Sequence, residues 1–120
     1  MTKSIYKEII LDHYRNPRNY GKLKDATHSA DSNNPLCGDK LFIDMIVEGD
    51  IISDIKFHGK GCAISMASAS MLTERLKSQP LAAIQEINEA EIQKMLGVEL
   101  SPSRVKCAML AIRVMSQSTR

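Results

Sequence analysis

The fold class is decided by residues 40–58, KLFIDMIVEGDIISDIKFH. In an extended chain from Lys40 to Glu48, one face carries Leu41, Ile43, Met45 and Val47, and the other carries Lys40, Phe42, Asp44, Ile46 and Glu48. This period of two is typical of a half-buried strand. A second alternating run follows from Ile51 to His58, after the turn Glu48-Gly49-Asp50. Two such runs joined by a Gly-containing turn predict a β-hairpin, so the sheet is expected to be antiparallel.

The segments around this hairpin complete the predicted architecture. A polar segment, Asp25 to Asn34, is expected to form a weak edge strand, and Gly59-Lys60-Gly61 is expected to end the last strand. Helical spacing and capping residues predict a first helix that stops near Asn16 and further helices at residues 62–77, 80–87, 88–97 and from 101 onward. This order predicts one α+β domain, residues 1–120, in which helices cover one face of a small three-stranded antiparallel sheet.

Composition and charge exclude several classes of function. The chain has 120 residues, with 16 Lys+Arg against 14 Asp+Glu, and a net charge of +2 argues against binding nucleic acid through its phosphates. Only 4% of residues are aromatic, which argues against base stacking. No run of about 18 apolar residues predicts a membrane span. No signal peptide is expected at the N-terminus, so the chain is expected in a reducing cytoplasm, where its three cysteines stay as thiols.

The three cysteines lie at the starts of predicted helices or in a loop. In Cys37-Gly38-Asp39, residues two apart in an extended segment point to the same side, so thiol and carboxylate can converge. Cys62 is expected at a helix N-terminus, where the dipole stabilises negative charge. Cys107 is expected early in the last helix. A core cysteine would more often lie in the middle of such an element.

Three thiolates and one carboxylate are ligands that zinc accepts in tetrahedral geometry, and thiolates also bind iron–sulfur clusters. Packing roles for single cysteines, and a turn-capping role for Asp39, stay open on spacing alone. His58 is expected to be a solvated residue on the polar face of its strand, and His13 and His28 are expected to be poorer ligand candidates still. The seven methionines are expected to fill the core.

Three motifs around these residues resemble the iron–sulfur cluster assembly family of SufU, IscU and the N-terminal domain of NifU. The chain carries the first as Asn34-Pro35-Leu36-Cys37-Gly38-Asp39, the second as the run from Phe57 to Ser65, and the third as Arg104-Val105-Lys106-Cys107-Ala108. An N-terminal signature, His13 to Asn19, adds to the resemblance, which covers nearly the whole chain.

This resemblance implies a SufE/NifU-like fold and a function in iron–sulfur cluster assembly. It implies that Cys37, Asp39, Cys62 and Cys107 bind zinc at rest, and that Cys37 accepts persulfide sulfur from a cysteine desulfurase of the SufS or IscS type. Arg104 is expected to steady the charged intermediate. The chain would then be a zinc-dependent, sulfurtransferase-type acceptor rather than a free-standing enzyme. Scaffold or acceptor proteins of cluster assembly are its other expected partners, with no nucleic acid or membrane among them.

Within the family, the chain is expected to be closest to SufU-like proteins. IscU-type members carry His just before the third cysteine, where this chain has Lys106. The IscU-type Leu-Pro-Pro-Val-Lys motif is also absent, since residues 100–106 read LSPSRVK. Yet the insertion of some twenty residues that SufU members usually carry between the second and third cysteines is missing here.

Several functions stay open on the sequence. A zinc-bound sulfur carrier is the leading interpretation, and a scaffold that assembles a [2Fe–2S] cluster on the same ligands, with transient cluster or iron binding, is the alternative. A thiol enzyme with Cys62 as nucleophile and His58 as base is a third hypothesis. A zinc-stabilised interaction module without sulfur chemistry is the fourth.

Overall fold

The computed structural model describes residues 2–34 and 38–119, with side chains from residue 5 onward. The described residues contain five helices and three strands. In chain order they are α1 (Thr2–Arg15), β1 (His28–Asn34), β2 (Asp39–Glu48), β3 (Ile51–Lys60), α2 (Ala63–Leu76), α3 (Ala83–Glu86), α4 (Glu89–Leu96) and α5 (Pro102–Ser118).

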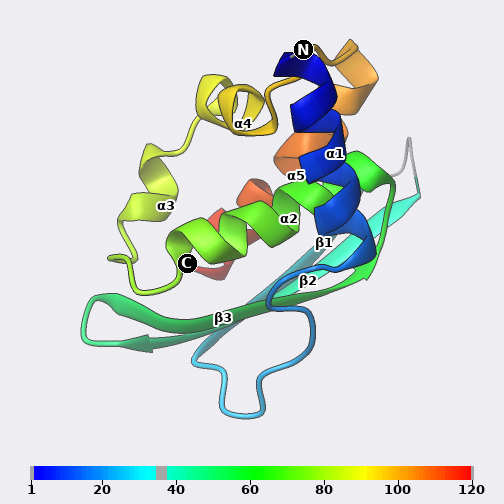
Figure 1. The fold of residues 1–120 in the computed structure, drawn as a ribbon. Helices are drawn as coiled ribbons and strands as arrows, with labels where there is room; N and C mark the ends of the chain where they lie inside the picture. Colours follow the sequence, from blue (N-terminus) through cyan, green and yellow to red (C-terminus); the bar gives the residue numbers. More distant parts are fainter. Residues whose placement is uncertain (1, 35–37, 120) are drawn as a thin grey trace.

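The three strands form one antiparallel sheet in the order β1-β2-β3, with the helices on one side of it (Figure 1). Helix α5 contacts β1 and β2, α2 contacts β3, and α1 packs on α2. Among the described residues, the connection between α1 and β1 crosses the other side of the sheet (Figure 1). The predicted α+β class, with a three-stranded antiparallel sheet and helices on one face, is therefore confirmed.

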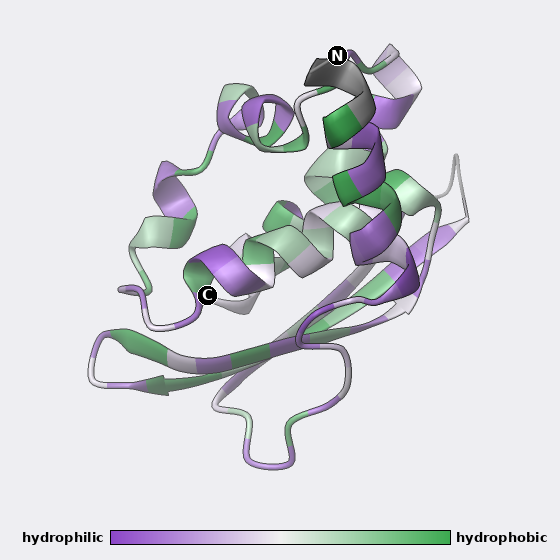
Figure 2. Ribbon diagram, in the orientation of Figure 1, coloured by the Kyte–Doolittle hydropathy of each residue, from purple (hydrophilic) through white to green (hydrophobic). Residues whose placement is uncertain are grey.

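Alternation along β2 and β3 separates the two faces of the sheet, as the banding of the strands in Figure 2 shows. Leu41, Ile43 and Met45 are fully buried under the helices, and so are Ile55 and Phe57. The even-numbered residues between them face outward. Burying a large apolar side chain contributes about 1.5–3 kcal/mol to the stability of the fold. A one-residue shift in pairing would move these side chains to the exposed face, so their burial also fixes the register. One irregularity, a register shift between Ile46 and Val47, was not predicted.

The glycine-containing segment after His58 does not end the strand, contrary to the prediction. Gly59 and Lys60 pair with Leu41 and Lys40, and the strand ends only before Gly61. Gly59 has a φ of +142°, and a Cβ built on it would lie 2.0 Å from the Lys40 carbonyl oxygen. A glycine is therefore required here for close approach of two strands, and this pairing carries β3 toward Cys62.

Gly59→Ala is expected to destabilise the fold by at least about 3 kcal/mol, because a backbone carbonyl cannot move aside as a flexible side chain can. Urea unfolding followed by circular dichroism measures the loss. Gly49→Ala is the control, since Gly49 also has a positive φ (+61°) but no atom within 4 Å of its added Cβ. Equal losses in the two variants would contradict the close-approach argument.

Helix α2 packs tightly because its buried residues are small. Ser65, Ala67, Ser68, Ala69 and Ser70 are fully buried between the sheet and the neighbouring helices. The serine hydroxyls are hydrogen-bonded: Ser68 donates to the Ala108 carbonyl of α5 at 2.8 Å. Within the described residues, no buried side-chain nitrogen or oxygen lacks a partner.

His13, in the last turn of α1, joins this helix to α2 and is buried. Its Nδ1 lies 2.7 Å from the hydroxyl of Ser70, and its Nε2 lies 3.7 Å from a carboxylate oxygen of Glu74. The backbone N–H of Arg18 also donates to the Ser70 hydroxyl, at 2.9 Å. Burial lowers the pKa of His13 below its ordinary value; the Arg18 guanidinium acts in the same direction, whereas Glu74 and Asp12 oppose it.

This lowered pKa predicts a loss of stability in mild acid. The unfolded chain binds a proton at His13 near pH 6.5, whereas the folded chain binds it only at lower pH. The stabilisation is therefore complete above pH 6.5 and is lost as the pH falls through the folded-state value. Urea unfolding at pH 7.5 and 5.5 measures the slope, which His13→Gln should flatten and His28→Gln should leave unchanged. An unaltered slope in His13→Gln would refute the assignment.

Candidate metal centre

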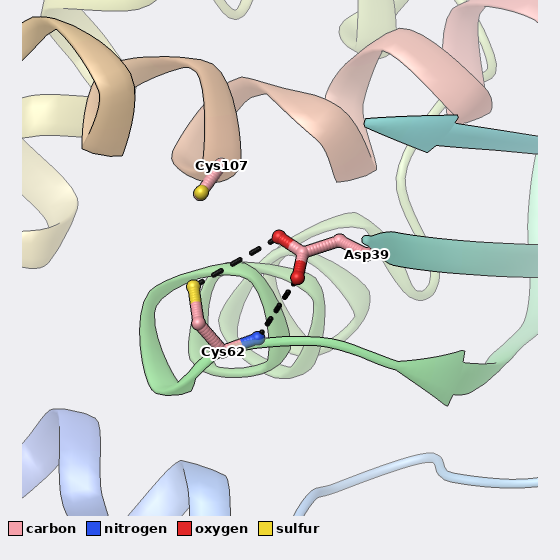
Figure 3. Close-up of side chains that lie close together, drawn as sticks. All are labelled: Asp39, Cys62 and Cys107. Atoms are coloured by element: carbon pink, nitrogen blue, oxygen red, sulfur yellow. Dashed lines mark hydrogen bonds between the residues drawn. The ribbon is translucent and has the colours of Figure 1, made fainter. Parts of the chain in front are cut away.

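Asp39, Cys62 and Cys107 come together from three separate segments of the chain. One ligand atom from each, a carboxylate oxygen and two sulfurs, all lie within 4.8 Å of one another. In Figure 3 the Cys107 sulfur points from α5 toward the space between Asp39 at the start of β2 and Cys62 at the start of α2. The convergence expected for these three residues is thus present in the structure.

Asp39 is buried and is held by Cys62. The backbone N–H of Cys62 donates to one carboxylate oxygen at 3.1 Å, and the Cys62 thiol lies 3.9 Å from the other (Figure 3). A carboxylate buried at the first position of a strand needs such partners, since desolvation alone would disfavour it. This arrangement leaves an oxygen of Asp39 facing the sulfur of Cys62.

The two described cysteines differ in exposure and position. Cys62 is partly exposed and is the N-cap of α2, so it lies beside the free N–H groups of the first helical turn. Cys107 is fully buried in the second turn of α5, and the side-chain amide of Asn34 lies 3.9 Å from its sulfur. The predicted helix start at Cys62 is thus correct to within one residue.

Two residues beside the centre were not singled out from the sequence. Ser65 is fully buried, with its hydroxyl 3.7 Å from the Cys62 sulfur and 3.1 Å from the Cys62 carbonyl, to which it donates. Asn34 pairs with Asp39 across the ends of β1 and β2. Asn34 lies in the quoted first motif and Ser65 lies three residues after Cys62, which is one helical turn; both spacings were available in the sequence.

Gly61 allows the approach of α2 to the carboxylate. A Cβ on Gly61 would lie 2.2 Å from the Ser65 hydroxyl and 3.3 Å from the Asp39 carboxylate. A side chain here would therefore push directly into the centre. This explains a glycine before Cys62, a position where the backbone dihedral itself does not demand one.

The remaining predicted site residues have different outcomes. Cys37 lies outside the described residues. Gly38, between Cys37 and Asp39, has a φ of +70° and lies in a turn, so it does not have the extended backbone that was expected there. Arg104 is exposed in the first turn of α5, three residues before Cys107. His58 stacks on Phe42, with ring centroids 4.6 Å apart on the outer face of the sheet, which does not support it as a base for Cys62.

The donor set suits zinc. A tetrahedral zinc ion with Zn–S of about 2.3 Å and Zn–O of about 2.0–2.2 Å keeps neighbouring ligand atoms roughly 3.5–3.8 Å apart. The observed limit of 4.8 Å requires each of the three atoms to move inward by well under 1 Å. Asp39, Cys62 and Cys107 would fill three positions of a tetrahedral site and leave the fourth for another ligand.

Asp39→Asn is expected to lower zinc affinity at least about tenfold, because the neutral amide keeps the shape and the contact with the Cys62 N–H but loses the anionic donor. Competition with a chromophoric chelator measures the affinity. Asp44→Asn is the control: Asp44 lies on the same strand but accepts hydrogen bonds from Leu23 and Ser29 on the outer face. Unchanged affinity in Asp39→Asn would show that Asp39 is not a ligand.

Comparison with known proteins places this centre in a family. A family model for the NifU-like N-terminal domain matches residues 5–120. The chain belongs to this family. The resemblance drawn from the three sequence motifs is thereby confirmed, and the centre lies on those motifs.

Relatives in this family carry two kinds of name. The zinc-dependent sulfurtransferase SufU of Bacillus subtilis is 37% identical, over 95% of this chain and 88% of its own length. The iron–sulfur cluster assembly scaffold protein IscU of Aquifex aeolicus is also 37% identical, over 92% of this chain and 71% of its own. The alignment with SufU spans 131 positions, more than the 120 residues of this chain, so SufU has residues that this chain lacks.

Solved structures show the same fold. FiSufU from Fervidobacterium islandicum AW-1 is 26% identical with a TM-score of 0.80, and the match covers all of both chains. A NifU-like N-terminal protein from Brucella abortus reaches the same TM-score at 17% identity, over 98% of this chain and 94% of its own. Within the described residues, no helix combines the length and apolar character needed to cross a membrane.

Proposed function

We propose that this chain is an iron–sulfur cluster assembly protein that accepts sulfur from a cysteine desulfurase at a zinc-bound thiol centre. The observation that carries the proposal is the meeting of Asp39, Cys62 and Cys107 within 4.8 Å, from three separate segments. Cys37 would supply the fourth ligand and the sulfur-accepting thiol, in accordance with the resemblance. The zinc-dependent sulfurtransferase name of the 37% identical SufU supports zinc as the metal.

In this proposal, zinc held by the four residues keeps the thiols deprotonated near neutral pH. The Cys37 thiolate attacks the outer sulfur of a persulfide on the desulfurase. A new S–S bond forms on Cys37 as the S–S bond of the donor breaks, and the donor cysteine leaves as a thiolate. Arg104, an exposed cation three residues before Cys107, is proposed to steady the negative charge of this exchange.

Anaerobic incubation with a cysteine desulfurase and cysteine tests the proposal, followed by intact mass and metal analysis. The expected product carries one zinc and gains the mass of at least one sulfur atom, and Cys37→Ser gains none. A wild-type chain that binds zinc but gains no sulfur would contradict the transfer role. That result would favour the thiol enzyme or the zinc-stabilised interaction module instead.

A second candidate is a scaffold that assembles a [2Fe–2S] cluster on the same ligands. IscU relatives named as scaffolds, 37% identical in Aquifex aeolicus and 34% in Thermotoga maritima, favour it. Cysteine thiolates are ligands of iron–sulfur clusters as well as of zinc. Iron, sulfide and visible absorption after anaerobic reconstitution would support this function, and colourless zinc protein that resists reconstitution would oppose it. Lys106→His, which restores the IscU-type residue, tests whether this position decides between the two.

A further inference from the structure

A recess lies on the outer face of the sheet, on the side away from the helices. It is a hollow of about 420 Å³, within the range of ligand pockets. It lies at the end of the sheet where β2 begins and β3 ends, and residues 19–21 run along the edge of β3 beside it. The residues that line it are Tyr20, Lys40, Phe42, His58, Gly59 and Lys60.

The floor of this recess is aromatic. Phe42 and His58 are a cross-strand pair, and their rings stack at 4.6 Å with only 7° between the planes. The half-exposed Tyr20 is fixed at the side, since its hydroxyl donates to the Gly59 carbonyl at 3.2 Å. Such a rigid ring surface suits an apolar or aromatic side chain from a partner.

The rim of the recess is cationic. Lys40 and Lys60 lie directly opposite each other on β2 and β3, an arrangement in which two like charges repel. Lys40 lies over the Phe42 ring, with its ammonium 5.3 Å from the ring centroid. Within residues 5–34 and 38–119, neither lysine forms a salt bridge, and no acidic side chain lines the recess. Bound carboxylates would relieve this repulsion.

Two residues that line the recess are close in sequence to residues of the metal centre. Lys40 directly follows Asp39, and Lys60 precedes Cys62 by two residues. Because side chains alternate along β2, Asp39 points toward the helices while Lys40 points to the outer face. A protein that reaches the centre around this end of the sheet would therefore meet the two lysines as well.

We infer that this recess docks an acidic segment, bearing an apolar or aromatic side chain, of the protein that donates sulfur to the centre. This inference rests on the proposed function. Carboxylates of the segment would pair with Lys40 and Lys60, and its apolar side chain would lie on Phe42 and His58. A small phosphate ligand is less suited, since neither an arginine fork nor a helix N-terminus lines the recess.

The test measures sulfur transfer from a cysteine desulfurase at varied concentrations of the zinc-loaded chain. In Lys40→Glu/Lys60→Glu, we expect the KM for the chain to rise about tenfold in 50 mM salt, with kcat changed less than about twofold. The difference should shrink in 500 mM salt, because screening weakens exposed charges. Phe42→Ala should raise KM in both salts. Zinc content and circular dichroism check that each variant is intact.

Lys94→Glu/Arg113→Glu is the matched control, because it makes the same change in net charge with exposed residues on α4 and α5. A KM in Lys40→Glu/Lys60→Glu equal to that of the wild type, or an equal rise in the control, would overturn the docking assignment alone. A wild-type chain that takes up no sulfur at all would instead overturn the proposed function, and the docking assignment with it.

Discussion

Cys107→Ser is expected to lower zinc affinity by more than about a hundredfold, the largest effect of any single substitution considered. Replacing a residue that only orients a ligand already costs roughly 10–100-fold in metal affinity, so removal of a direct ligand should cost more. The Cys107 sulfur is fully buried and faces Asp39 and Cys62, so no other side chain in the described ranges can replace it without rearrangement. Chelator competition under anaerobic conditions measures the affinity.

The control for this substitution is Ala108→Ser on the same helix. Ala108 is also fully buried, and serine there introduces a buried hydroxyl without removing a donor. Zinc affinity in Ala108→Ser should match the wild type even if the protein is somewhat less stable. A similar loss in both variants would show that packing of α5, rather than the sulfur, controls binding.

Metal removal is expected to lower the midpoint of thermal unfolding by about 10–20 °C. A ligand present at a thousand times its dissociation constant stabilises the folded state by about 4 kcal/mol. For a chain of this length, each kcal/mol shifts the midpoint by several degrees. The centre also links β2, α2 and α5, so an ion bound there holds together segments distant in the chain.

Calorimetry of the zinc-loaded protein, with and without a chelator, measures this shift. Cys107→Ser should unfold at the same temperature in both conditions, which separates loss of the ion from a direct effect of the chelator. A shift below about 2 °C in the wild type, with zinc shown to be lost, would mean that the ion contributes little to the stability of this fold.

Much of the fold follows from local patterns. The alternation in residues 40–58 predicted the hairpin and its buried face, because a period of two admits only one assignment of faces. Capping residues also located helix ends: Asn88 accepts a hydrogen bond from Glu91, and Gly97 has the left-handed φ of a helix stop. Ser101 is the N-cap of α5 and accepts a hydrogen bond from the backbone N–H of Arg104, so the helix expected from residue 101 onward begins there.

The errors arise where contacts distant in the chain override local signals. Gly59 looked like a strand breaker, yet pairing with β2 keeps it in the sheet. The burial of His13 was not predicted, because it comes from the packing of α1 on α2. Three of the four predicted ligands were found together, since each lies at or near the beginning of a helix or strand. Ser65 was missed although its spacing of one helical turn from Cys62 was available, because α2 also contains Ser68 and Ser70.

X-ray absorption at the zinc edge of the protein loaded with one equivalent of zinc tests the metal centre most directly. Coordination by Cys37, Asp39, Cys62 and Cys107 predicts three sulfur neighbours at about 2.3 Å and one oxygen neighbour at about 2.0–2.2 Å. In Asp39→Ala the oxygen contribution from the carboxylate should be lost while the sulfurs remain. A spectrum with imidazole scattering, or with fewer than two sulfurs, would contradict the four-residue centre on which the proposed function depends.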